Sequence, residues 1–205
     1  MNLVFLASFL TFILVIFFIM RNQQKKFKEQ EAEFWSREQR ANAVRRKSLD
    51  NLNYIKIPLE AFPTHLLNDD ARVLECIDIL ESLTSRKIVN FTGWSNTDLK
   101  LEYGTANLEA LTEFDQNYTL LVRTLQKWAD CLVECGFQKE AVPLMEFAVS
   151  TNTDISRTYY ILAEYYASVG RFQEIDRLRT VAKNLRSANR NVIAKHLQES
   201  YPDVF

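Results

Sequence analysis

The sequence contains few residues that interrupt a helix, since its 205 residues include only four Gly and four Pro. Leu, Ala, Glu, Gln and Arg, which favour helices, are common by comparison. Such a composition predicts an all-α protein. The length is sufficient for one membrane anchor and one domain of about 150 residues.

The chain also lacks an excess of positive charge. Lys and Arg number 25 against 26 Asp and Glu, and the formal net charge is −1. A protein that binds nucleic acid through its phosphates needs a basic surface. We therefore expect no nucleic-acid partner.

Cysteine and histidine are scarce as well, with three Cys and two His. Cys76, Cys131 and Cys135 cannot all pair with one another, and we interpret them as small buried thiols in a reducing compartment. His65 and His196 are isolated in the sequence, so we expect no metal site. The glycines stand too far apart for a phosphate-binding loop, and no Ser or Cys has a motif-supported base. We expect neither enzyme activity nor a cofactor.

The longest apolar run lies at the N-terminal end. Residues 3–20, LVFLASFLTFILVIFFIM, contain no charge, Gly or Pro, and 14 of these 18 residues are Leu, Ile, Val or Phe. As a helix this run measures about 27 Å, close to the thickness of the hydrocarbon layer. A cleaved signal peptide would carry basic residues before the run and small residues after it, whereas here the basic residues follow. We predict an uncleaved transmembrane anchor in residues 1–20.

The basic residues after the run set the expected orientation. Arg21, Lys25, Lys26 and Lys28 should remain on the cytoplasmic side of the membrane. The expected protein is therefore a single-pass protein of the cell membrane, with its N-terminus outside and its C-terminal domain in the cytoplasm. The alternative is an outward-facing domain that assists envelope or secretion assembly.

Two segments of different character follow the anchor. Residues 21–47 contain no Pro or Gly and are predicted to continue the helix beyond the membrane. In residues 48–70 this pattern ends, because Pro58 and Pro63 disfavour helix immediately before themselves. The apolar residues of this second segment predict an extended linker that packs against a helical domain in residues 71–205.

Helical periodicity returns within that domain. The apolar pattern predicts helices over about 71–88, 105–115, 118–135, 138–150, 155–169, 172–186 and 189–199. Residues 91–104 are expected to form a loop between the first two helices. Gly136 and Gly170 should each end a helix, because glycine accepts the left-handed backbone conformation that closes one.

Two of the predicted helical pairs match when the sequence is shifted by 34 residues. The matching pairs are Ala129 with Ala163, Gly136 with Gly170, Glu140 with Glu174, Leu144 with Leu178, and Ala148 with Ala182. Small residues at matching positions allow neighbouring helices to approach closely, and large residues between them fill the remaining space.

This pattern resembles the tetratricopeptide repeat, a helix–turn–helix unit of 34 residues. The resemblance covers two units, residues 122–155 and 156–189. Residues 71–115 would form a degenerate first unit, and a capping helix would follow over residues 189–199. The second unit departs from the pattern at Arg179, where a large apolar residue is usual.

In this family the first helices of successive units line a groove that binds extended or helical peptides. The resemblance implies a partner-binding groove that presents Arg123, Gln126, Asp130, Arg157, Tyr160 and Glu164. The alternative is that these residues are merely exposed polar positions. The loop 91–104, with Phe91, Trp94 and Tyr103, is a second candidate surface.

Together these expectations predict a membrane-tethered scaffold or adaptor that binds a partner protein or peptide near the cytoplasmic face of the membrane. A structural subunit of a membrane complex, whose anchor packs against partner helices, is the alternative. The sequence leaves the identity of the partner and the oligomeric state open.

Overall fold

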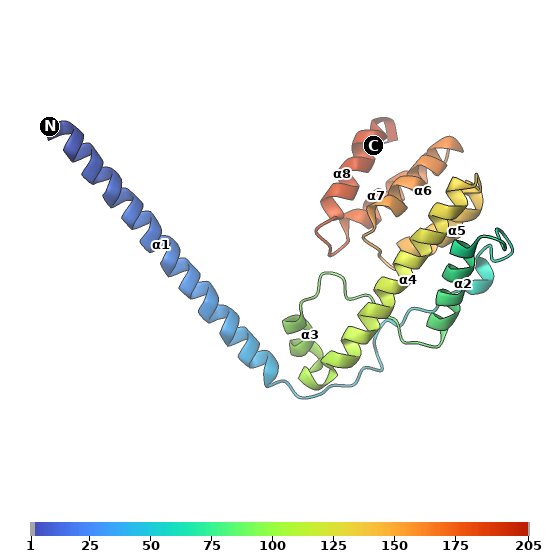
Figure 1. The fold of residues 1–205 in the computed structure, drawn as a ribbon, viewed down its shortest axis with the longest axis horizontal. Coiled ribbons are helices and arrows are strands. Elements are labelled where there is room, and N and C mark those ends of the chain that lie inside the picture. The colour runs from blue at the N-terminus through green and yellow to red at the C-terminus, as the bar shows by residue number, and fades with distance from the viewer. Residues whose placement is uncertain (1–2, 205) are drawn as a thin grey trace. The chain divides into compact units, whose positions relative to one another are not determined.

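The structure, a computed structural model, describes residues 3–204, which are 72% helix and contain no strand. The prediction of an all-α protein is confirmed. Eight α-helices and three short 3-10 helices are present in this range (Figure 1). The chain divides into two compact units. The N-terminal unit comprises Met1–Lys47 and Asn96–Asn107, and the helical unit comprises Ser48–Ser95 and Leu108–Phe205.

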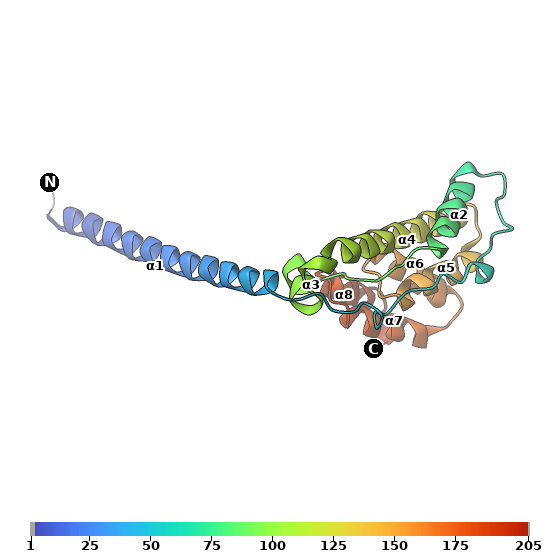
Figure 2. The ribbon, with the colours of Figure 1, turned by 90° about the horizontal axis from the view of Figure 1, so that it is seen from below.

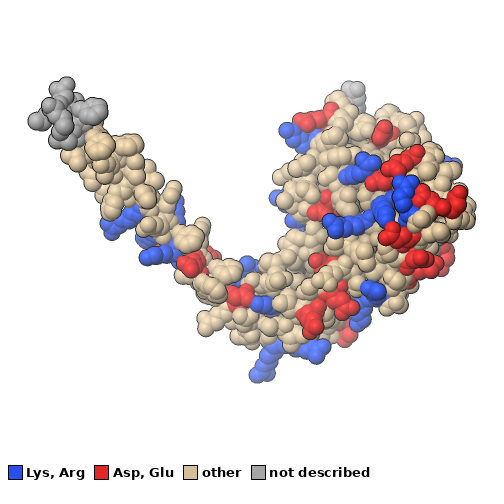
Figure 3. Space-filling model, viewed as in Figure 1, with Lys and Arg blue, Asp and Glu red and all other residues tan. Residues whose placement is uncertain are grey.

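The N-terminal unit is dominated by α1, a helix of 40 residues that runs over Leu3–Asn42. From Ala7 onward it is the one helix of the described residues that is long and apolar enough to cross a membrane. Figure 3 shows uncharged surface on α1 until the first basic side chains appear. The large apolar side chains of its residues 9–20 are exposed, and Phe12 and Phe18 are each 62% exposed.

The helix α1 ends at Asn42, earlier than the predicted end at residue 47, because contacts within the unit redirect the chain. The Asn107 side chain donates hydrogen bonds to the carbonyls of Lys47 at 2.8 Å and Tyr103 at 2.7 Å. It also accepts one from Nε of Arg46 at 3.0 Å. These bonds hold residues 46 and 47 in a non-helical path.

Part of the predicted loop 91–104 is helical. The short helix α3 covers Asn96–Tyr103, and the 3-10 helix η2 follows at Thr105–Asn107. The side chain of Glu38 on α1 accepts a hydrogen bond from Thr97 at 2.8 Å and pairs with Lys100. The bonds from Lys100 and Thr97 lower the pKa of Glu38. These tertiary contacts stabilise a helix too short to be marked by periodicity.

In the helical unit, the segment before α2 contains only one turn of 3-10 helix, η1 at Leu59–Ala61. Its apolar residues pack against the core formed by the helices. The Ile55 N–H donates to the Ile88 carbonyl at 2.9 Å. The ring of Phe62 lies 6.1 Å from that of Trp128 and 5.6 Å from that of Phe147. The segment is therefore fixed to the helices rather than solvated.

The remaining helices pack against one another largely in chain order, as Figures 1 and 2 show. They are α2 (Ala71–Thr84), α4 (Leu108–Glu134), α5 (Gln138–Ser150), α6 (Ser156–Ser168), α7 (Phe172–Lys183) and α8 (Arg190–Ser200), followed by the 3-10 helix η3 (Pro202–Val204). Each of α4 to α7 contacts the next helix, α2 packs on α4, and α8 also contacts α6.

The prediction of two separate helices over residues 105–115 and 118–135 is wrong. Residues 108–134 form the single 27-residue helix α4. Its buried residues Leu111, Phe114 and Tyr118 continue one apolar stripe through the predicted break. Neither Pro nor Gly stands between them, so nothing interrupts the backbone hydrogen bonds.

The 34-residue spacing recurs in the backbone. The helices α4 and α6 end at Glu134 and Ser168, and α5 and α7 begin at Gln138 and Phe172, each 34 positions apart. The intervening glycines, Gly136 and Gly170, both have positive φ, of 85° and 71°.

Matching residues of the two turns also form matching bonds. The Phe137 N–H donates to the Leu132 carbonyl, and the Arg171 N–H donates to the Tyr166 carbonyl, both at 2.8 Å. The matched apolar residues of the helices are at most 2% exposed, namely Ala129, Leu144, Ala148, Ala163, Leu178 and Ala182. The sequence repeat therefore corresponds to repeated local geometry and repeated burial.

Candidate functional site

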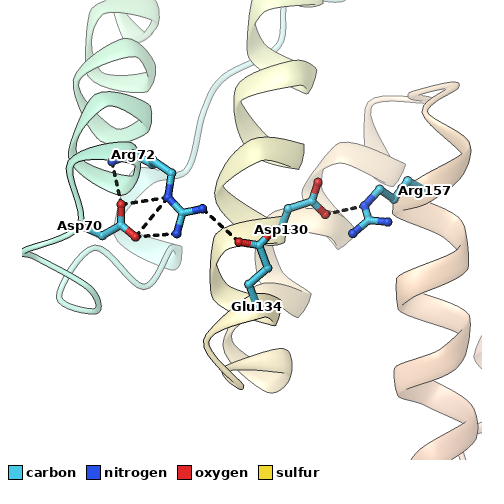
Figure 4. Close-up of polar contacts among 5 residues, drawn as sticks. All are labelled: Asp70, Arg72, Asp130, Glu134 and Arg157. Atoms are coloured by element: carbon cyan, nitrogen blue, oxygen red, sulfur yellow. Dashed lines mark hydrogen bonds and ion pairs between the residues drawn. The ribbon is translucent and has the colours of Figure 1, made fainter.

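Three of the six predicted groove residues form one hydrogen-bonded cluster between α4 and α6. Asp130 on α4 accepts a bond from Nε of Arg157 on α6 at 2.8 Å, as Figure 4 shows. The same Oδ1 atom accepts from Nε2 of Gln126 at 2.8 Å. The Thr158 hydroxyl donates to Oε1 of Gln126 at 2.6 Å. The cluster joins two helices that are separated in the sequence by α5.

An ion-pair network extends this face from α4 to α2. Nη1 of Arg72 on α2 donates to Glu134 on α4 at 3.0 Å, while Arg72 also binds Asp70 at the start of its own helix (Figure 4). Lys127 on α4 pairs with Glu75 on α2 at 2.6 Å. The hydrogen bonds from Arg72 lower the pKa of Asp70. Most of these side chains are well exposed, so solvent screens each pair and its contribution to the stability of the unit is small.

The other three predicted groove residues lie apart from the cluster. The ring of Tyr160 lies against that of His196 on α8, with 3.8 Å between ring centroids and an angle of 38° between the ring planes. Glu164 is exposed, and burial together with the charge of Glu164 raises the pKa of Tyr201. Arg123 is exposed and forms no ion pair within residues 3–204. Of the six predicted groove residues, three are therefore bonded to one another, whereas Arg123 and Glu164 are exposed to solvent.

The second candidate surface, residues 91–104, is divided between the two units. Phe91 is buried in the helical unit, and its N–H donates to Asp115 at 3.1 Å. The Trp94 ring meets the Phe91 ring edge-on, and the Arg186 guanidinium lies 4.9 Å from the Trp94 ring centroid. Tyr103, in contrast, belongs to the N-terminal unit.

The cysteines differ in burial. Cys76 and Cys131 are buried, and burial raises the pKa of Cys76 to about 11, so this thiol is protonated at neutral pH. Cys135 is exposed, because it lies in the turn after α4 has ended, and for this residue the prediction of burial is wrong. Within the described part of the chain, no group of three His, Cys, Asp or Glu side chains could hold a metal ion.

Sequence reasoning missed a cleft of about 440 Å³ in the helical unit. Residues 53–56, residues 89–94 and the C-terminal ends of α5 and α7 line it. Lys56 and Arg186 are the charged residues of the lining, which contains no Asp or Glu. The alternation of Ile and Lys over residues 55–57 was the signal that could have placed Lys56 on an exposed edge.

Comparisons of the chain with protein-family models, with curated proteins and with solved structures found no match.

Proposed function

We propose that this protein is a membrane-tethered scaffold or adaptor. In this proposal α1 anchors the chain in the cell membrane, and the helical unit binds a partner protein or peptide near the cytoplasmic face. Tethering confines the partner to the membrane surface and thereby raises its effective concentration.

The observation that carries the proposal is the exposure of large apolar side chains on α1. Burying one such side chain is worth about 1.5–3 kcal/mol, and the chain itself does not cover those of residues 9–20. A lipid bilayer covers them on every side of the helix. The helical unit has a separate core of its own, which suits a domain displayed at the end of an anchor.

The positive residues after the apolar run support the orientation. Arg21, Lys25, Lys26 and Lys28 are all exposed on α1 and would remain in the cytoplasm. The N-terminus would then lie outside the cell and the helical unit inside it.

Within the proposal, the helical unit is a short array of tetratricopeptide-like repeats. The repeated turn bonds and the repeated burial of small residues support units at 122–155 and 156–189. The first helices of such units, α4 and α6, would present the partner-binding face. On that face Arg123, Tyr160 and Glu164 are the residues free of the Asp130 cluster.

Site-specific crosslinking in cells tests the scaffold directly. A photoreactive amino acid at position 123 or 160 of the full chain should capture a specific partner protein. The same group at position 139, an exposed residue of α5, is the matched control and should not. If positions 123 and 160 capture no protein, the scaffold proposal fails.

The alternative, a structural subunit of a membrane complex, makes a different prediction for the anchor. An unrelated apolar helix in place of residues 3–20 should leave an adaptor able to capture its partner. The same replacement should disable a subunit whose anchor packs against partner helices.

Labelling of Cys135 tests on which side of the membrane the helical unit lies, because this thiol is exposed while Cys76 and Cys131 are buried. A maleimide that does not cross membranes should label Cys135 only after intact cells are permeabilised. Labelling of intact cells would instead support the outward-facing alternative. A Cys135→Ser variant identifies the labelled thiol.

A further inference from the structure

The cleft of about 440 Å³ in the helical unit has a neighbour of about 320 Å³. Both hollows are lined by Tyr54, Ile55 and Lys56, so this extended stretch forms a ridge between them. The two linings together contain Lys56, Arg86, Lys87 and Arg186, and neither contains Asp or Glu. The whole chain has a net charge of −1, so these two linings concentrate positive charge that acidic residues balance elsewhere in the sequence.

Arg186 is held in place from two sides. The preceding Leu185 is buried in the core, and the following Ser187 donates a hydrogen bond to Asp154 at 2.5 Å. Gly93 lies so close that a Cβ atom there would be 2.8 Å from Cβ and the carbonyl oxygen of Arg186. Trp94 places its ring 4.9 Å from the guanidinium carbon. A cation supported in this way is preorganised for a ligand.

Lys56 is positioned by the alternation of an extended chain. Its neighbours Ile55 and Ile57 pack against the core, while Lys56 itself is exposed. Nζ of Lys87 lies 5.2 Å from the ring centroid of Tyr54, so a second lysine is held beside the same ridge.

These cations differ from those on the α2, α4 and α6 face. There, Arg72, Lys127 and Arg157 each pair with a carboxylate. In contrast, Lys56, Arg86, Lys87 and Arg186 form no ion pair with any of the side chains that the structure describes. Two acids lie near the cleft but outside both linings: Asp115 accepts a hydrogen bond from the Phe91 N–H, and Asp154 accepts one from the Ser187 hydroxyl.

We propose that the two hollows bind an extended acidic peptide segment of the partner protein. Its carboxylates would contact Lys56 at the ridge, Arg186 in the larger hollow, and Arg86 and Lys87 in the smaller one. Charge-assisted hydrogen bonds from Lys and Arg to carboxylates are among the stronger polar contacts. The inference rests on the proposed binding function and adds a docking site separate from the α4 and α6 face.

The arrangement of the cations favours a peptide over a small anion. A single phosphate or carboxylate is bound best by donors that converge on one point. Here Arg186 lines one hollow, Arg86 and Lys87 line the other, and Lys56 lies on the stretch that both hollows share. A chain that carries several carboxylates can satisfy all of them at once. The acidic sequence pI of about 6.2 also argues against a nucleic-acid ligand.

The test uses the full chain in micelles of an uncharged detergent and a fluorescein-labelled hexaglutamate peptide as the probe. Fluorescence anisotropy should show binding of hexaglutamate and none of hexaglutamine. The double variant Lys56→Glu with Arg186→Glu should bind hexaglutamate at least about tenfold more weakly. The control, Lys139→Glu with Arg190→Glu, makes the same change in net charge at exposed positions outside both linings and should bind normally.

Several results would overturn the assignment. An equal loss in both double variants would show that only net charge matters. Inorganic phosphate that displaces the peptide at equimolar concentration would indicate a small-anion site, and tighter binding of oligouridylate would indicate a nucleic-acid surface. Because Lys56 and Arg186 are exposed, circular dichroism should show unchanged helix content in the test variant.

The outcome is separable from that of the scaffold proposal. If hexaglutamate does not bind while crosslinking at positions 123 and 160 still captures a partner, the cleft assignment falls and the scaffold stands. If hexaglutamate binds as expected but crosslinking at positions 123 and 160 finds no partner, the cleft assignment stands and the α4 and α6 face is not the partner-binding face.

Discussion

The half-buried carboxylate of Asp115 fixes a loop, although burial disfavours its charge. This residue of α4 accepts a hydrogen bond from the Phe91 N–H at 3.1 Å and so fixes the segment that precedes Trp94. Burial raises the pKa of Asp115, and the bond from Phe91 only partly opposes that effect. The ionised carboxylate is therefore less favourable in the folded chain than in the unfolded one.

The substitution Asp115→Asn should consequently stabilise the protein at pH 7. A folded-state pKa above the unfolded value gives stability that is present at low pH and is lost as the pH rises through the folded pKa. Asn retains an oxygen acceptor for Phe91 without the charge. We expect a higher urea midpoint for the variant at pH 7 and a smaller difference below about pH 4.

The control for this measurement is Asp78→Asn at an exposed position of α2, which should leave the midpoint unchanged at both pH values. A lower midpoint for Asp115→Asn than for the natural protein at pH 7 would contradict the argument. It would mean that the Phe91 N–H is held by a charged carboxylate and not by a neutral amide oxygen.

At the scale of helices, the sequence predicted turns and helix starts correctly where apolar side chains recur with helical spacing. The turns at Gly136 and Gly170 and the starts of α5 and α7 followed from the pattern alone. The short helix α3 did not, because it depends on Glu38, whose partners Thr97 and Lys100 lie about 60 positions away in sequence. Periodicity contains no information about such contacts.

The continuity of α4 can be tested at Gln116, an exposed residue within the predicted break. Proline there would remove the hydrogen bond to the Thr112 carbonyl and clash with it, which costs about 3 kcal/mol or more. Gln116→Ala keeps the bond and should change stability by less than about 0.5 kcal/mol. Urea unfolding followed by circular dichroism measures both. Equal stability of the two variants would show that the helix is interrupted at this point.

For the molecule as a whole, the candidate site was predictable only in part. The resemblance implied that Gln126, Asp130 and Arg157 line a groove for a partner, and in the structure the three side chains bind one another. The pattern could not show that these groups already satisfy one another. Nor could it show the cleft, because Lys56 and Arg186 are brought to one hollow by the fold of segments about 130 positions apart.

The proposed action of these surfaces at a membrane depends on insertion of the long apolar helix α1. Fourteen Leu, Ile, Val and Phe residues between positions 3 and 20, at about 0.3–0.6 kcal/mol each, favour insertion by several kcal/mol. Two arginines near the centre of the span cost about 2.5–3.5 kcal/mol each, which is enough to cancel that gain. The double variant Phe12→Arg with Ile13→Arg should therefore move from the membrane pellet to the supernatant on alkaline carbonate extraction.

The matched control is Phe27→Arg with Phe34→Arg, which adds the same charge to exposed positions of α1 beyond the apolar run. These residues would lie at or outside the membrane surface, where added positive charge attracts anionic headgroups rather than opposing insertion. We expect this variant to stay in the pellet. Retention of the Phe12 and Ile13 variant would show that α1 is held at the membrane by something other than its own span. Release of the control would place the membrane contact further along α1 than residues 3–20.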